Sequence, residues 1–131
     1  MGVSRMKRAA TLGFVIQLVI VVFFVPSASA GVIMQGFYWD AQDPSMSWYD
    51  KMAKNANQLK TSGFTAIWIP PVHKGDSGGY SNGYDPFDDY DIGSKDQKGT
   101  VGTRWGTREQ LQRAVAVMRA NGLDVYVDLV L

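Results

Sequence analysis

The chain has 131 residues, of which 46% are hydrophobic, 12% aromatic and 19% charged, a globular composition that excludes collagen-like and low-complexity chains. It contains no cysteine, which excludes disulfides, thiolate metal sites and a cysteine nucleophile. The formal net charge is +1, but residues 31–131 alone hold ten basic and twelve acidic residues, and so slightly acidic a segment is not expected to bind nucleic acid.

The first thirty residues have the pattern of a secretory signal peptide. Three basic residues precede Leu12–Val25, an almost wholly apolar segment, and the small residues Ala28 and Ala30 form a cleavage pattern. The apolar segment has 14 residues and would span about 21 Å as a helix, short of the roughly 30 Å hydrocarbon core of a membrane. We therefore expect residues 1–30 to be removed after Ala30. The protein is then expected to be secreted or periplasmic, without a membrane anchor.

Residues 31–69 predict a strand, a helix and a second strand. The apolar run from Val32 to Phe37 is typical of a strand. Ser47 is a good helix N-cap, and Gly63 is expected to end the helix that follows it. The expected apolar face of this helix comprises Trp48, Met52, Ala56 and Leu59. The segment Phe64–Ile69 is rich in β-branched and aromatic residues and predicts the next strand.

After an irregular segment at 70–106, the sequence predicts one more helix and one more strand. Thr107–Gln110 has the pattern of a capping box, and Asn121 and Gly122 end the helix before the apolar run Leu123–Leu131. Strands that alternate with helices and are apolar on both faces indicate a parallel sheet in an α/β fold. Because three such strands do not make a finished domain, we expect the N-terminal portion of a larger one. The pattern alone permits a doubly wound sheet or a barrel.

The irregular segment 70–106 is expected to carry a ligand site. Loops that follow the carboxyl ends of parallel strands line the active sites of α/β folds, and this loop is far longer than the usual connection of about two to six residues. Aromatic faces bury the apolar faces of sugar rings, while carboxylates accept hydrogen bonds from sugar hydroxyl groups. The loop supplies six aspartates and the aromatic residues Tyr80, Tyr84, Phe87, Tyr90 and Trp105. The alternative is that these rings only pack the loop against the sheet.

Other polar residues do not complete a known metal or triad motif. The aspartates between Asp85 and Asp91 lack the spacing of a calcium-binding loop. His73 is the only histidine, and with no partner motif nearby it is expected to be a surface loop residue. Asp128 lies in an otherwise apolar strand, where an unpaired carboxylate would be unstable. It therefore either supports the site from behind or contacts the substrate directly.

Five segments, in order, resemble the α-amylase family of glycoside hydrolases, family 13. They are similar to the family's first strand, its second strand, its G-Y-x-x-x-D-x-Y-D-L-G segment, the stretch that follows in bacterial members, and the D-V-V-x-N-H strand up to its last two residues. In this sequence they are residues 31–39, 63–71, 83–93, 97–107 and 124–130. The resemblance covers essentially all of residues 31–131 and implies an N-terminal fragment that ends at barrel strand three.

The resemblance implies a (β/α)8 TIM barrel, of which strands 1–3 and helices 1–2 are present. It implies retaining hydrolysis of α-1,4-glucosidic bonds in starch-like or glycogen-like glucans, which requires two carboxyl groups. In the family these two groups and a third, stabilising aspartate lie on strands four, five and seven, so no catalytic residue is expected in this chain, which should be inactive alone. The family also implies calcium, with ligands outside this chain.

The resemblance also implies which residues contact the α-glucan. Tyr84 matches the tyrosine that stacks on the sugar at the cleavage point, and Asp85 lies where some members place a polar substrate contact. Gln35 and Trp39 map to cleft-lining positions, and Asp128 is expected to support the active site.

Two alternatives stay open. A transglycosylase or an α-1,6-glucosidase of the same fold would share these segments and differ in residues outside the chain. A truncated, non-catalytic glucan-binding protein would use Tyr84 and its neighbours for binding only.

Overall fold

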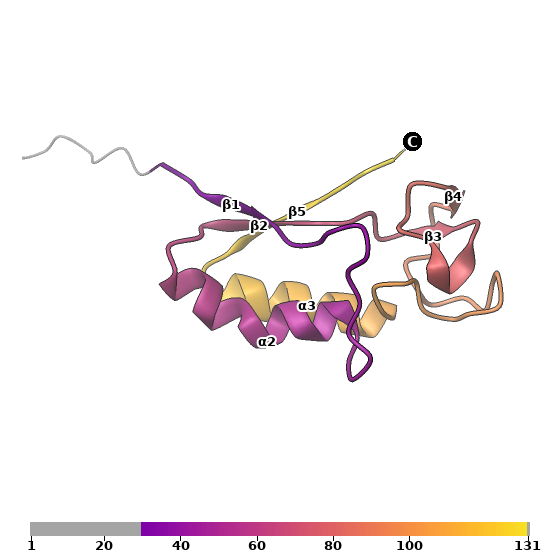
Figure 1. Ribbon diagram of the computed structural model, residues 1–131, viewed down its shortest axis with the longest axis horizontal. Helices are drawn as coiled ribbons and strands as arrows, with labels where there is room; N and C mark the ends of the chain where they lie inside the picture. The colour runs from indigo at the N-terminus through magenta and orange to yellow at the C-terminus, as the bar shows by residue number, and fades with distance from the viewer. Residues whose placement is uncertain (1–29, 131) are drawn as a thin grey trace, which may run out of the picture. The chain divides into compact units, whose positions relative to one another are not determined.

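The computed structural model describes residues 30–130 (Figure 1), so the predicted signal peptide, apart from Ala30, lies outside the described residues. In chain order the elements are β1 (Ile33–Gln35), α2 (Trp48–Thr61), β2 (Ala66–Ile69), β3 (Lys74–Gly75), η1 (Gly78–Tyr80), β4 (Pro86–Asp88), α3 (Arg108–Ala120) and β5 (Asp124–Val127). Within this described part of the chain, no helix has the length and hydropathy needed to cross a membrane.

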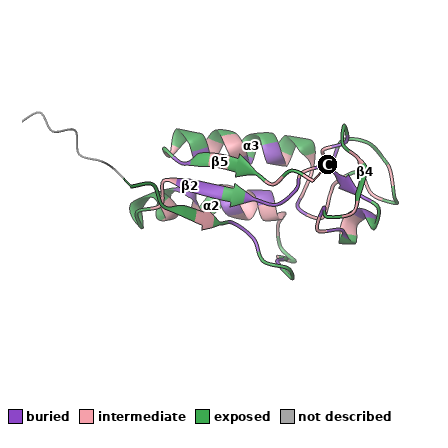
Figure 2. Ribbon diagram, turned by 90° about the horizontal axis from the view of Figure 1, so that it is seen from above, coloured by how far each residue is buried: buried purple, intermediate pink, exposed green. Residues whose placement is uncertain are grey.

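Strands β1, β2 and β5 form a parallel sheet in that order. At its centre, Ile67 of β2 pairs with Met34 of β1 and with Val125 of β5. Both long helices lie on the same side of this sheet and pack against each other (Figure 1, Figure 2). The predicted parallel α/β arrangement is confirmed. Strands added in sequence, with their helices on one face, are the arrangement of successive units in a barrel.

Both predicted helix starts are confirmed, and one carboxylate connects them. Ser47 caps α2 by accepting from the backbone N–H of Asp50 at 3.1 Å, and Thr107 caps α3 in a capping box with Gln110. The carboxylate of Asp50 also accepts from Gln110 Nε2 at 2.8 Å and pairs with Arg113 at 2.5 Å. The first turn of α2 is therefore bonded directly to the beginning of α3.

The core lies between the two helices and the side of the sheet that faces them. Its buried members include Tyr49, Met52, Ala56, Ile67, Ile69, Leu111, Ala114, Met118 and Leu123. Trp48, expected on the core face, is only partly buried, because its indole Nε1 donates to Gly36 O at 2.7 Å at the edge of the sheet. Tyr49, which the helical spacing did not indicate, is wholly buried instead.

A second, two-stranded sheet lies within the segment 70–106, for which the sequence predicts no regular element. Strands β3 and β4 are antiparallel, with Lys74 opposite Asp88, and η1 lies between them in sequence. Strands of two and three residues are too short to show an alternating pattern, which is why the sequence does not predict them. The small sheet follows the carboxyl end of β2 (Figure 1) and carries the loop that forms the site.

Candidate functional site

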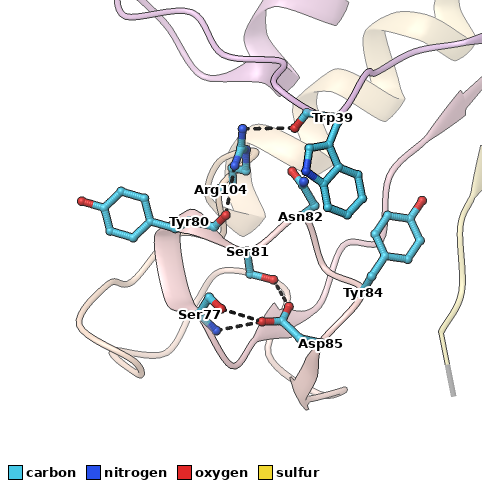
Figure 3. Close-up of a pocket in the computed structure, with 8 residues that line it drawn as sticks. All are labelled: Trp39, Ser77, Tyr80, Ser81, Asn82, Tyr84, Asp85 and Arg104. Carbon is cyan, nitrogen blue, oxygen red and sulfur yellow. Dashed lines mark hydrogen bonds between the residues drawn. The ribbon is translucent and has the colours of Figure 1, made fainter.

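A pocket of about 370 Å³ is formed by segments that follow the carboxyl ends of β1 and β2 (Figure 3). Its lining comes from the turn after β1, from the loop that includes η1, and from the segment before α3. The lining residues are Trp39, Ser77, Tyr80, Ser81, Asn82, Tyr84, Asp85 and Arg104. This volume is within the range of small-molecule sites, and parallel α/β folds bind their ligands in this position.

Trp39 and Tyr84 form an aromatic wall of the pocket. Their rings are stacked, with centroids 6.0 Å apart and an interplanar angle of 13°. Trp39 is 66% exposed and Tyr84 is 42% exposed, so the rings offer apolar surface to solvent instead of filling the core. Exposed, nearly parallel aromatic rings suit the apolar faces of sugars. Two of the residues expected to bind substrate therefore share one surface.

The hydroxyl group of Tyr84 is fixed by a residue 44 positions along the chain. It donates to Asp128 Oδ2 at 2.6 Å, and Asp128 is itself placed by a backbone hydrogen bond to Ile69 O at 3.0 Å. Burial, together with the hydrogen bond to Asp128 and the negative charge of that carboxylate, raises the pKa of Tyr84 to about 12. Asp128 thus fixes the hydroxyl group of Tyr84, and its support of an active site stays a prediction.

Asp128→Asn is expected to lower the pKa of Tyr84 from about 12 toward the ordinary tyrosine value of about 10, because the amide carries no charge. Since the folded-state pKa lies above the unfolded value, Tyr84 stabilises the fold fully below about pH 10 and less as the pH rises toward about 12. The phenolate absorbance of each protein, corrected by the matching Tyr84→Phe variant, measures this pKa. If the pKa of Tyr84 is the same in Asp128→Asn as in the wild type, burial alone raises that pKa.

The backbone of Tyr84 is held by a buried histidine, and the expectation that His73 is a surface residue was wrong. His73 is 4% exposed, and its Nε2–H donates to Gly83 O at 2.8 Å. Gly83 has a φ of 94°, and a Cβ there would lie 2.6 Å from the Cβ of Pro71, so only glycine allows this close approach. The partner of His73 lies ten residues away, where no local spacing indicates it.

Asp85 lines the pocket, but the loop itself already engages its carboxylate. One oxygen accepts from the backbone N–H and the hydroxyl of Ser77, at 3.0 and 2.8 Å, and the other accepts from Ser81. Burial acts to raise the pKa of Asp85, but the hydrogen bonds from Ser81 and Ser77 outweigh it and hold the pKa below its ordinary value. Gln35 ends β1, is exposed, and does not line this pocket. Substrate contacts by Asp85 and Gln35 stay predictions.

A buried lysine fixes the segment that precedes α3. Lys74 and Asp91 form a fully buried ion pair, with 3.7 Å between Nζ and Oδ2. The same Nζ donates to the carbonyl oxygens of Thr100, Val101 and Gly102, at 2.7, 2.8 and 3.0 Å. On the other side of the pair, Asp91 Oδ1 accepts from three backbone N–H groups. These contacts anchor the segment from which the pocket receives its arginine.

Calcium does not fit the described residues. Among residues 30–130, no three histidine, aspartate or glutamate side chains come together in a way that could hold a metal ion. The pocket carboxylate of Asp85 is bonded to two serines. The six to eight oxygen ligands that calcium requires are not assembled by this part of the chain.

The contacts made by Arg104 and Trp105 carry no signal in the sequence. Arg104 donates from Nη1 to Tyr80 O at 3.0 Å and from Nη2 to Trp39 O at 3.3 Å. Trp105 is buried, and its Nε1 donates to Asn82 O at 3.3 Å. The partners in these contacts are 23 to 65 residues apart, so neither periodicity nor local spacing predicts them.

The sheet, helices and pocket together define a class of protein: an α/β fold with a ligand-sized pocket at the carboxyl edge of parallel strands. No protein-family model matches the chain. The chain is 45% identical over 101 residues to a glucan 1,4-alpha-maltohexaosidase of Bacillus sp. (strain 707), covering 77% of this chain and 19% of that protein. It is 42% identical to an alpha-amylase of Geobacillus stearothermophilus, covering 76% and 18%. It is 37% identical to the cytoplasmic alpha-amylase of Escherichia coli (strain K12), covering 75% and 20%.

The chain therefore spans about a fifth of the length of these relatives. Among solved structures, a truncated alternansucrase from Leuconostoc mesenteroides NRRL B-1355 is similar, with a TM-score of 0.63 and 30% identity, over 75% of this chain and 10% of that one. The chain belongs to the α-amylase family of glycoside hydrolases. The resemblance carried by the sequence motifs, and with it the assignment to an enzyme family, is confirmed.

Proposed function

We propose that this chain supplies one wall of the substrate cleft of an α-amylase-type glycoside hydrolase, which hydrolyses α-1,4-glucosidic bonds of starch-like glucans with retention of configuration. The observation that carries the proposal is the exposed, stacked pair of Trp39 and Tyr84 beside a polar pocket. The names of the relatives, a glucan 1,4-alpha-maltohexaosidase and alpha-amylases, support an α-glucan as the substrate.

The chain's own residues would bind and orient the substrate. In a retaining glycosidase, one carboxylate attacks the anomeric carbon while a second carboxyl group protonates the leaving oxygen and later activates water. The family resemblance puts these two groups outside residues 31–131. Tyr84 would stack on the sugar at the cleavage point, with Asp128 keeping its ring from rotating away, and Trp39 would continue the apolar wall.

A second function, transfer of glucosyl units, is favoured by one observation. The similar solved structures include alternansucrase in complex with isomaltononaose, with a TM-score of 0.63 and 28% identity over 75% of this chain and 9% of that one. Hydrolysis and transfer begin with the same attack on the anomeric carbon and differ in the acceptor, water or a second sugar. The pocket of this chain would serve either reaction.

Incubating the full-length protein with maltohexaose distinguishes these functions. Shorter products that appear first as the α-anomer in nuclear magnetic resonance spectra support retaining hydrolysis, whereas longer oligosaccharides support transfer. Binding without turnover would support the non-catalytic glucan-binding alternative. A protein that neither binds nor converts maltohexaose would rule out the proposed function.

We also propose that the protein is exported and cleaved after Ala30, on the sequence pattern of residues 1–30. One relative is a cytoplasmic alpha-amylase, so homology alone does not decide this point. The exported protein is expected to begin at Gly31 when its N-terminus is sequenced. A mature protein that retains Leu12–Val25 would contradict cleavage.

A further inference from the structure

Arg104 joins two parts of the pocket lining that are far apart in the sequence. Its guanidinium group donates to Tyr80 O at 3.0 Å, across 24 positions, and to Trp39 O at 3.3 Å, across 65 positions (Figure 3). The two acceptors are backbone carbonyl oxygens, so the contact fixes the path of the chain at both places. The planar fork of an arginine spans two such acceptors in a fixed geometry, which the single ammonium group of lysine does not reproduce.

The position of Arg104 is itself set by the core. Its Cζ lies over the ring of Trp105, 5.5 Å from the centroid, and Trp105 is 1% exposed and packs edge-on against Phe37 at 6.0 Å. The segment that carries both residues is anchored by the buried Lys74. Arg104 therefore connects the buried Trp105 to the largely exposed turn that contains Trp39.

The hydrogen bonding of Arg104 is incomplete. Its Nε is buried and has no acceptor among residues 30–130, although buried donors in proteins are nearly always satisfied. Among the described residues, the guanidinium group therefore makes its contacts through the two Nη groups, which bond to the carbonyl oxygens of Tyr80 and Trp39.

Trp39 depends on this contact more than Tyr84 does. Tyr84 has anchors of its own, the hydrogen bond to Asp128 and the bond from His73 to the preceding carbonyl. Trp39 is 66% exposed, and its ring contacts Tyr84 by stacking. Its backbone carbonyl is held by Arg104.

We propose that Arg104 is a positioning residue that holds Trp39 parallel to Tyr84, so that the two rings, with centroids 6.0 Å apart, form one surface for two adjacent sugar units. This inference rests on the proposed function, because it assigns the surface to an α-glucan. Arg104 would then set the preference for a glucan over a single glucoside without touching the reacting bond.

The test uses Arg104→Met and Arg104→Lys in the full-length protein, with Arg119→Met, on an exposed position in the last turn of α3, as the matched control. Loss of a charged hydrogen bond is expected to raise KM for maltohexaose about tenfold in Arg104→Met, with kcat changed by less than about twofold, because binding that is equal in ground and transition states is lost. KM for 4-nitrophenyl α-glucoside, whose single glucose unit covers only one of the two rings, is expected to change less than about twofold. Arg104→Lys keeps one contact and should give an intermediate KM. Arg119→Met should match the wild type.

Hydrogen exchange measures the positioning of Trp39 without any substrate. Amides of residues 37–44 are expected to exchange faster in Arg104→Met and not in Arg119→Met. An unchanged KM for maltohexaose, an equal loss for both substrates, or unchanged exchange in both Arg104 variants would overturn the inference. A wild-type protein inactive on maltohexaose would overturn the proposed function, whereas the exchange result still decides whether Arg104 positions Trp39.

Discussion

Tyr84→Ala in the full-length protein is expected to lower kcat/KM for maltohexaose about 10- to 70-fold. A sugar stacked on the ring covers roughly 60–100 Å² of apolar surface, and at about 25 cal/mol per Å² its loss costs about 1.5–2.5 kcal/mol. Because the ring is 42% exposed and lies outside the core, the change should leave the melting temperature close to that of the wild type. Steady-state kinetics and thermal melts of the same preparations measure both quantities.

Tyr84→Phe is the control, because it keeps the stacking surface and removes only the hydroxyl group that bonds to Asp128. Asp128 is only partly buried, so water can replace the lost donor and the loss in kcat/KM should be much smaller. If Tyr84→Ala keeps kcat/KM within about twofold of the wild type and lowers the melting temperature instead, the ring packs the loop and does not bind substrate.

Lys74→Met is expected to remove about 3–5 kcal/mol of unfolding free energy, a large part of the roughly 5–15 kcal/mol typical of a domain. The substitution preserves most of the side-chain volume but leaves the buried carboxylate of Asp91 without a counter-ion. It also deprives the carbonyl groups of Thr100, Val101 and Gly102 of their donor. Urea unfolding of the full-length protein measures the change through the midpoint of the transition.

Lys95→Met provides a matched comparison, since Lys95 also pairs with an aspartate. Its Nζ lies 2.7 Å from Asp88 Oδ2, but 46% of the lysine side chain is exposed. Exposed pairs contribute about 0–1 kcal/mol, so this variant should unfold almost like the wild type. If the two lysine variants lose equal stability, the buried pair has no special role in holding the segment before α3.

The helix starts and the parallel strands were predictable because their signals are local. Ser47 and Thr107 satisfy backbone donors within three residues of themselves, and such caps are visible in any window of the sequence. The apolar runs at 32–37, 64–69 and 123–131 likewise predict strands by composition alone. In each case the residues that carry the signal lie within a few positions of the structure that they determine.

The burial of His73 and the bridging role of Arg104 were not predictable in the same way. The sequence around His73, a lone histidine after two prolines, is typical of an exposed loop. Only the fold brings the carbonyl group of Gly83 within hydrogen-bonding distance and buries the ring. Arg104 is one of several basic residues in a glycine-rich segment, and only the fold brings it to Tyr80 and Trp39. Family motifs indicated Trp39 and Tyr84 as binding residues, but the parallel stacking of their rings comes from the structure alone.

The carboxylate of Asp50 lies at the N-terminal ends of both α2 and α3. Helices α2 and α3 each lead directly into a strand of one parallel sheet, β2 and β5, so they run in the same direction, and the hydrogen bond between Asp50 and Gln110 shows that their positive ends lie side by side. One negative charge, bonded to Gln110 and Arg113, compensates both ends at once. Unwinding of either first turn removes a bonding partner from the other, so fraying at the two helix starts is coupled. Because the Arg113 side chain is 56% exposed, this coupling is expected to be modest, and the two starts should open together more often than two unconnected helix ends would.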